Sequence, residues 1–201
     1  WDAHRVRLAV GYQLEGTDVT AAFGPGSASP GREPLLGEFD VAGERLTLLV
    51  NHFKSDYVPQ ADDASRDELI RRAQAQRLTQ ARVVREWASA RLAADPRALL
   101  LVAGDLNAPP AGLPVRIVAG GTGETPLTNL LPAHAPAEYT FVLHGQPVIL
   151  DHLLASPALA ARLTAVSVPH PNAAAAPELA ADPTTTARAS DHDPLLATFK
   201  W

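Results

Sequence analysis

Short apolar runs separated by polar turns predict most of the strands in this chain. Residues 35–41 and 46–50 are two such runs joined by Ala-Gly-Glu-Arg, which predicts a hairpin, and residues 6–12 predict an earlier strand. Residues 98–103 are continuously apolar, as is typical of a central strand covered on both faces. Later strands are predicted at 139–143, 148–155, 163–168 and 195–199, the first two forming a second hairpin.

A long helix is predicted over about residues 65–94, and a short one near 113–119. An apolar stripe with helical spacing supports the long helix; it consists of Ile70, Ala73, Ala81, Val84 and Ala88. Arg77 interrupts this stripe, and Asp95-Pro96 ends the helix. Strands alternating with helices predict an α/β fold.

Composition narrows the class of protein. A chain of 201 residues with 46% apolar residues suits one globular domain over residues 1–201. The net charge of −5 gives no global positive field, so any nucleic acid must be held by a local basic surface. The absence of cysteine excludes disulfides, thiolate nucleophiles and cysteine zinc sites, and no apolar run is long enough to cross a bilayer. Methionine is also absent, so Trp1 is not a start residue.

Four short segments carry the residues expected to do chemistry, and most follow a predicted strand. They are Asn51-His52-Phe53-Lys54-Ser55, Gly104-Asp105-Leu106-Asn107, Leu150-Asp151-His152 and Ser190-Asp191-His192-Asp193-Pro194. Together they supply carboxylates, imidazoles and carboxamides, which metal-assisted cleavage of a phosphate ester requires. Asp105 and Asn107 are two apart, so an extended backbone aims both side chains the same way. A simple strand-ending turn explains that segment equally well.

Asp151 lies within an apolar strand, where a carboxylate needs a partner. We predict that His192 is this partner and that the pairing leaves one ring nitrogen free to take a proton from water. A structural salt bridge to an arginine is the alternative. His52 and Lys54 could neutralise a phosphate, and Asp191 suits Mg²⁺, although a polar capping loop is an alternative for the segment around Asp191.

The remaining histidines, His4, His134, His144, His152 and His170, are interpreted as surface or packing residues. The Arg71-Arg72 pair is interpreted as part of a solvated helical face.

The ordered set of these four segments, with Tyr139-Thr140-Phe141 before the third, resembles the endonuclease/exonuclease/phosphatase (DNase I-like) superfamily. The resemblance covers about residues 32–199 and is nearest to bacterial predicted extracellular nucleases, through His170-Pro171-Asn172-Ala173. It implies a four-layer α/β sandwich of two mixed β-sheets flanked by helices. It also implies a secreted or periplasmic location.

The resemblance implies roles for individual residues. The catalytic set would be His52, Asp105, Asn107, Asp151 and His192, with Asp191 as a metal ligand. His192 is the expected general base, although the Asp105 carboxylate is an open alternative. Asn51, Lys54 and Asn172 would contact substrate, and the cofactor would be Mg²⁺ or Mn²⁺, with Ca²⁺ possible.

One departure from the family pattern lies near the start of the chain. The family begins with an Asn-bearing strand and a Gln-Glu motif whose Glu binds Mg²⁺, and Tyr12-Gln13-Leu14-Glu15 does not match it. We therefore expect the domain to lack its first strands here and to continue upstream of Trp1.

Three functions fit these observations. The first is a metal-dependent phosphodiesterase, a nuclease acting on DNA or RNA. The second is a phosphomonoesterase or lipid phosphodiesterase on the same fold, because the fold alone does not choose the substrate. The third is a non-catalytic binding domain that has lost its metal site.

Overall fold

The structure is a computed structural model that describes residues 6–13, 34–57 and 63–201. Leu14 and Glu15 of the motif near the start lie outside the described residues. The strands are β1 (Val6–Gln13), β2 (Leu35–Val41), β3 (Glu44–His52), β4 (Leu99–Asp105), β5 (Thr128–Asn129), β6 (Phe141–Leu143), β7 (Gln146–Val148), β8 (Asp151–Ala155), β9 (Leu163–Ser167) and β10 (Leu196–Phe199). The helices are α2 (Asp63–Ala94), α3 (Leu113–Ala119), α4 (Leu130–His134), α5 (Pro157–Ala160) and the 3₁₀ turn η1 (Pro177–Ala181).

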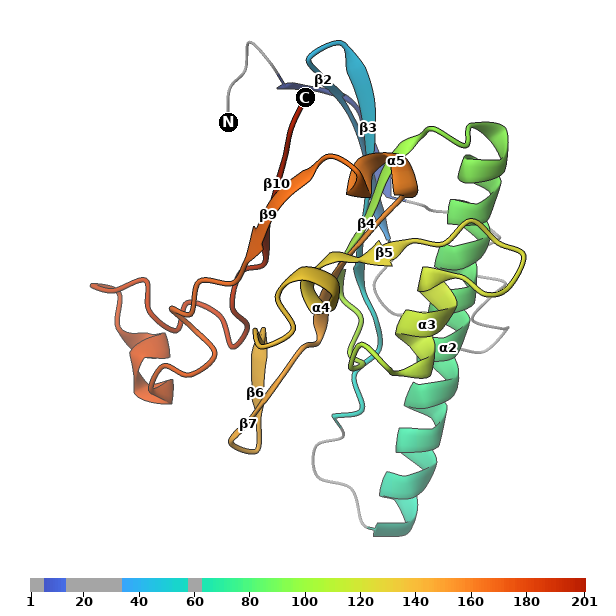
Figure 1. The fold of residues 1–201 in the computed structure, drawn as a ribbon. Coiled ribbons are helices and arrows are strands. Elements are labelled where there is room, and N and C mark those ends of the chain that lie inside the picture. Colours follow the sequence, from blue (N-terminus) through green and yellow to red (C-terminus); the bar gives the residue numbers. More distant parts are fainter. Residues whose placement is uncertain (1–5, 14–33, 58–62) are drawn as a thin grey trace.

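A six-stranded mixed sheet forms the centre of the molecule, in the order β1-β2-β3-β4-β8-β5 (Figure 1). β2 and β3 form the predicted hairpin, and the turn between them places Ala42 and Gly43 at positive φ. β3 and β4 run parallel, with α2 in the crossover between them, while β8 is antiparallel to β4. The carboxyl ends of β3 and β4 therefore meet the start of β8 at one edge of the sheet.

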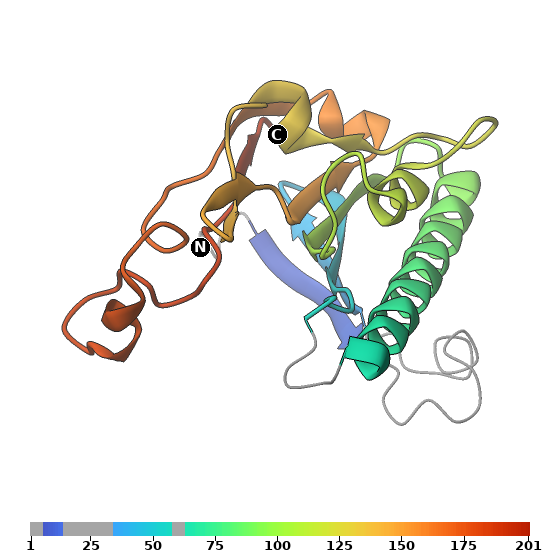
Figure 2. The same cartoon turned by 90° about the horizontal axis from the view of Figure 1, so that it is seen from below.

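Helices cover one face of this sheet, and a smaller sheet covers the other. α2 and α3 lie on one side, whereas the segment containing β9 and β10 lies on the other (Figures 1 and 2). Leu100 and Val102 of β4 belong to the core under α2. Leu99 and Leu101 point the opposite way, into a core with Leu163 and Phe199 of the β9–β10 pair. The predicted α/β fold, with a mixed sheet and flanking helices, is confirmed. In place of the predicted second mixed sheet, the described residues show the antiparallel pair β9–β10.

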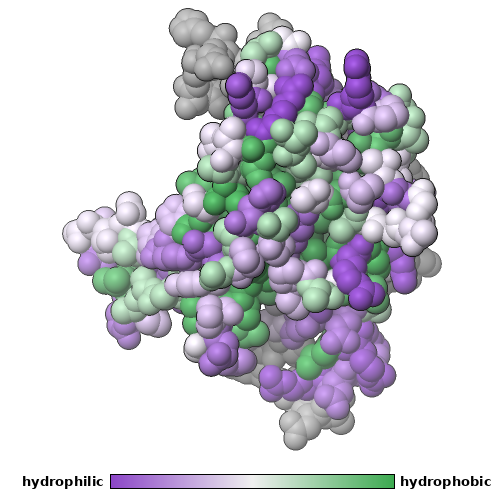
Figure 3. Space-filling model, in the orientation of Figure 1, coloured by the Kyte–Doolittle hydropathy of each residue, from purple (hydrophilic) through white to green (hydrophobic). Residues whose placement is uncertain are grey.

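Helix α2 begins two residues earlier than predicted and ends where predicted, at Ala94. At 1.5 Å per residue, its 32 residues span about 48 Å. Its first turns are exposed, and Arg71 and Arg72 both pair there with Glu68, which agrees with the predicted solvated face. Strongly hydrophilic residues gather over this end of the helix in Figure 3. None of the helices within the described ranges is long and apolar enough to span a membrane.

The second predicted hairpin needs correction. β6 and β7 form a small separate pair, closed by a turn in which His144 and Gly145 have positive φ. The predicted strand 148–155 breaks at Ile149 and Leu150, and β8 then joins the central sheet. The break has a local cause, because the hydroxyl of Thr140 accepts the backbone N–H groups of both Leu150 and Asp151.

Candidate active site

Two neighbouring strands bring the first polar side chains together. His52 at the end of β3 lies opposite Asp105 at the end of β4, and the Nε2 of His52 is 3.6 Å from the Oδ2 of Asp105. Gly104 permits this approach, because its φ is +123° and a Cβ atom there would overlap the carbonyl oxygen of Asn51. The closeness of the two strands therefore requires glycine at position 104.

Asn107 fixes the orientation of the Asp105 carboxylate. Its backbone N–H donates to Oδ1 of Asp105 at 2.8 Å, and its Nδ2 donates to Oδ2 at 2.8 Å and to the carbonyl of Phe53 at 3.0 Å. Asn107 adopts a φ of +48° to make these bonds. Since both amide hydrogens are used within the protein, Asn107 orients the carboxylate instead of offering a free donor to a phosphate.

The surroundings of Asp105 raise the pKa of its carboxyl group above the ordinary value. Burial raises the pKa of this carboxyl group, and the neighbouring Asp151 carboxylate raises it further. The N–H of Asn107 and the two nearby imidazoles oppose the increase without cancelling it.

Asp151 and His192 form the predicted pair. The Nδ1 of His192 lies 2.6 Å from the Oδ2 of Asp151, and the ring of Phe141 lies 4.7 Å from the imidazole, centroid to centroid. The bond to Asp151 raises the pKa of His192, although partial burial acts in the opposite direction. The carboxylate thus holds one ring nitrogen and stabilises the imidazolium that forms when the other takes a proton.

Thr140 connects the two members of this pair through the backbone. Its hydroxyl accepts the N–H of Asp151 at 3.1 Å, while its carbonyl accepts the N–H of Asp193, next to His192, at 2.8 Å. Thr140 is fully buried. The position of His192 relative to Asp151 is therefore set by hydrogen bonds to one residue as well as by the pair itself.

The Asp105 carboxylate brings all of these groups into one site. Its Oδ2 lies 3.6 Å from Nε2 of His52 and 4.0 Å from Nε2 of His192, which is bonded to Asp151. The predicted gathering of Asp105, Asp151 and His192 is present, and Asp191 is exposed beside His192.

The side chain of Asp193 anchors the loop that carries His192. Its Oδ1 accepts the N–H groups of Asn172 and Ala173, and its Oδ2 bonds the Nδ1 of His170 at 2.8 Å. His170 also bonds Glu138, and the bond to Asp193 raises its pKa. Burial acts to raise the pKa of Asp193, but its bonds outweigh that effect and lower it.

Two residues predicted to contact substrate are buried and hydrogen-bonded within the protein. Asn172 is buried and its Nδ2 donates to the carbonyl of His192, and Asn51 is buried with its Nδ2 bonded to the carbonyl of Leu49. Contact of either side chain with substrate stays a prediction. Lys54 is exposed next to this edge, where a substrate can reach it.

The structure changes the interpretation of one histidine and agrees with that of another. His170 was interpreted as a surface or packing residue, yet it forms part of the support for the loop carrying His192. His152 is a packing residue as predicted; it is fully buried, with bonds to Asn129 and to the carbonyl of Ala108.

Within residues 6–13, 34–57 and 63–201, no three His, Asp or Glu side chains gather as a metal site. Asp191 offers one carboxylate, whereas Mg²⁺ takes octahedral oxygen coordination that protein, water and substrate share. The described residues alone therefore do not form a complete ligand set for a divalent cation.

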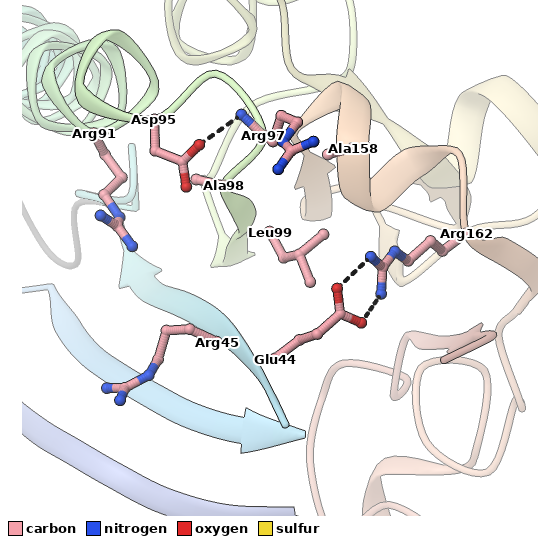
Figure 4. A pocket seen from close by; sticks show the side chains of 9 residues that line it. All are labelled: Glu44, Arg45, Arg91, Asp95, Arg97, Ala98, Leu99, Ala158 and Arg162. Atoms are coloured by element: carbon pink, nitrogen blue, oxygen red, sulfur yellow. Dashed lines mark hydrogen bonds and ion pairs between the residues drawn. The ribbon is translucent and has the colours of Figure 1, made fainter. Parts of the chain in front are cut away.

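A cavity of about 480 Å³ lies at the opposite end of the same strands. Figure 4 shows its lining, which comes from the starts of β3 and β4, the end of α2 and the segment around α5. Arg162 pairs there with Glu44 through two hydrogen bonds, and Arg45 pairs with Glu38 and Asp40. None of the predicted site residues lines this cavity, which is therefore separate from the Asp105–His192 site.

Comparison with known families decides the classification. A family model described as the Endonuclease/Exonuclease/phosphatase family matches residues 46–192, which include every predicted catalytic, substrate-binding and metal-binding residue. The chain belongs to this family. Phosphate-ester hydrolysis is the activity that family membership supports, and members of the family generally use divalent metals. No curated protein matches the sequence.

Solved structures of the family share the fold at low sequence identity. Truncated TDP2 of Caenorhabditis elegans is 17% identical, with a TM-score of 0.60 over 97% of this chain and 67% of that one. The 3′ phosphatase NExo from Neisseria, bound to a product DNA hairpin, is 17% identical, with a TM-score of 0.56 over 97% and 72%. The mannosyl-6-phosphatase of Bacteroides thetaiotaomicron is 15% identical, with a TM-score of 0.59 over 98% and 68%.

The chain spans only part of these proteins, and it covers 51% of the human Nocturnin catalytic domain. At these identities the likeness shows the fold alone.

Proposed function

We propose that this protein is a phosphodiesterase that cleaves nucleic acid with an activated water molecule. The observation that carries the proposal is the Asp151–His192 pair beside Asp105, because it supplies an oriented imidazole next to a second acid–base group. A binding domain that had lost catalysis would have no chemical need for this oriented pair.

His192 acts as the general base in this proposal. Its Nδ1–H donates to Asp151, so the lone pair of Nε2 accepts a proton from water as the water oxygen attacks phosphorus. The P–O bond to the leaving group then breaks, the leaving oxygen takes a proton from solvent, and His192 returns its proton to solvent. Proton transfer by a positioned base contributes about 10²- to 10⁴-fold to the rate. His52 also lies beside Asp105, where its imidazole can contact the phosphate or the leaving group.

Nucleic acid is the proposed substrate class. Two of the structurally similar proteins, NExo and Danio rerio TDP2, were solved with product DNA. Lys54 is exposed beside His52 and suits contact with a backbone phosphate. With a net charge of −5, binding should depend on this local contact and not on the overall field.

We further propose Mg²⁺ as cofactor, with Mn²⁺ and Ca²⁺ as alternatives, and Asp191 as one ligand. The ion would neutralise charge that develops on the phosphate. Water and substrate oxygens would supply part of its remaining coordination. An upstream segment of the same domain is the proposed source of further protein ligands. Secretion also stays a prediction.

Nicking of supercoiled plasmid by the full-length protein tests the function. We expect nicking that chelation abolishes and Mg²⁺ restores, and strong loss in His192→Ala. A matched control is His134→Ala, at an exposed helix end away from the site. If the protein hydrolyses p-nitrophenyl phosphate in preference to bis(p-nitrophenyl) phosphate, its activity is that of a phosphomonoesterase and the phosphodiesterase proposal is wrong. Full activity of folded His192→Ala would remove the proposed base.

A further inference from the structure

Arg77 lies on the buried face of α2, where the sequence shows only an interruption of an apolar stripe. It is 6% exposed and lies between the buried residues Ala73 and Ala81. A buried guanidinium is costly unless its N–H groups are bonded, so its partners show what the residue does.

Those partners belong to the two loops that leave β3 and β4 at the site. Nη1 of Arg77 donates to the carbonyl of Asn107 at 2.6 Å and to the carbonyl of Lys54 at 3.2 Å, and Nη2 donates to Asp56 at 2.6 Å. One turn further along α2, Oε1 of Gln80 accepts the N–H of Lys54 at 2.7 Å. The helix thus holds both loops through their backbones.

The held residues are directly connected to the reacting groups. Asn107 orients both oxygens of Asp105, and it does so at a positive φ that favours glycine. Lys54 is two residues from His52. The bond from Arg77 to the carbonyl of Asn107 stabilises this strained backbone, so its effect passes through Asn107 to the carboxylate of Asp105.

A second arginine on the same helix provides a comparison. Arg85 lies two turns beyond Arg77 and is 5% exposed. It donates to Glu124 and to the carbonyls of Val118, Ala119 and Thr125. These partners belong to α3 and the connection from α3 to β5, away from His192. The two arginines therefore match in burial, and each makes several hydrogen bonds to loops or helix ends, three for Arg77 and four for Arg85. Of the two, Arg77 is the one that holds the site.

We propose that Arg77 is a positioning residue for phosphate-ester hydrolysis, which fixes the loops after β3 and β4 so that His52 and Asp105 face the substrate correctly. This inference rests on the proposed function. Displacement of reacting groups by about 1 Å can cost about 10²-fold in rate, so a residue that never touches substrate can control kcat.

The test compares Arg77→Met with Arg85→Met in the full-length protein. Both should lower the thermal midpoint by similar amounts. We expect kcat to fall about 10- to 100-fold in Arg77→Met with KM changed less than about threefold, and kcat to stay within about threefold of wild type in Arg85→Met. Arg77→Lys keeps a charged donor and should recover part of kcat. Equal kcat losses in the two Met variants would overturn the proposal.

Hydrogen exchange separates this inference from the proposed function. In Arg77→Met, the amides of Phe53 and Asn107 should exchange faster, whereas Arg85→Met should accelerate Leu127, which bonds the carbonyl of Ala119. If the wild-type protein hydrolyses no phosphate ester, the proposed function is wrong. The exchange rates of Phe53 and Asn107 still test whether Arg77 holds the two loops. Unchanged exchange at Phe53 and Asn107 would overturn this positioning role. If Arg77→Met does not fold, the Arg77→Lys and Arg85→Lys pair is compared by the same measurements.

Discussion

Asp151 and His192 are 41 residues apart in sequence, yet the Oδ2 of one lies 2.6 Å from the Nδ1 of the other. Asp151 begins a strand of the central sheet, and His192 lies on a loop returning from the β9–β10 side. The pair therefore joins the two packed layers of the fold at the site, and its chemistry depends on how those layers meet.

Asp151→Asn tests the pair directly. The amide group of Asn can donate to Nδ1, which would move the ring proton to Nε2 and remove the lone pair that accepts a proton from water. We expect kcat to fall about 10²- to 10⁴-fold with little change in KM. Steady-state assays on a diester substrate measure this. The matched control is Asp95→Asn, at the far end of the strands, and an equal loss in that variant would contradict the assigned role.

Gly104→Ala should be strongly destabilising. A Cβ at this position overlaps the carbonyl of Asn51, and the φ of +123° is unfavourable for alanine. Gly43→Ala is the control, because Gly43 also has positive φ but its Cβ would meet no atom within 4 Å. We expect Gly43→Ala to cost about 1 kcal/mol and Gly104→Ala at least about 3 kcal/mol in the free energy of unfolding. Urea denaturation measures the free energy of unfolding of both variants. Similar losses would contradict the prediction and show that β3 and β4 can move apart at little cost.

Thr140→Val should lower both stability and kcat. Valine matches the shape of threonine but lacks the hydroxyl, so the buried N–H groups of Leu150 and Asp151 lose their acceptor. Each unsatisfied group costs about 1–3 kcal/mol. Thr140→Ser keeps the hydroxyl and should retain most of kcat. Thermal unfolding and kcat are measured for both variants; a serine variant as impaired as the valine variant would point to packing by the methyl group instead.

His152 should make stability depend on pH. Burial lowers the pKa of its imidazole in the folded state below the ordinary value of 6.5. Well above pH 6.5 the ring is neutral in both states and has no effect. As the pH falls below 6.5, the unfolded chain binds a proton that the folded protein does not, so the free energy of unfolding decreases. Urea unfolding at pH 7.5, 6.5 and 5.5 measures the decrease, which should be smaller in His152→Gln.

The sequence predicts the site well where a local pattern carries the constraint. Asp151 follows apolar residues in a strand, so a buried carboxylate with a partner could be expected, and His192 is that partner. His52 and Asp105 each end an apolar run, and parallel pairing of the two strands then brings them together. Hydrophobic periodicity likewise predicts the long helix, because one side of α2 is buried along most of its length.

What the sequence does not show are contacts to backbone groups. Arg77 donates to carbonyls 23 and 30 residues away, and any residue type can supply a carbonyl, so no pattern in the sequence marks these partners. Thr140 breaks a predicted strand for the same reason, since it accepts two backbone N–H groups. The burial of Asn51 and Asn172 also depends on tertiary packing. It could not be predicted from the sequence, because asparagine is usually exposed.

The residue-by-residue pairing of β3 with β4 has a consequence for sequence change. Because neighbouring side chains on a strand point to opposite faces, inserting or deleting a single residue within either strand would turn His52 away from Asp105. The solvent-exposed first turns of α2 have no such restriction, because they form no part of the β3–β4 pairing. Relatives of this protein should therefore vary in length at the exposed end of that helix and keep the length of both strands unchanged.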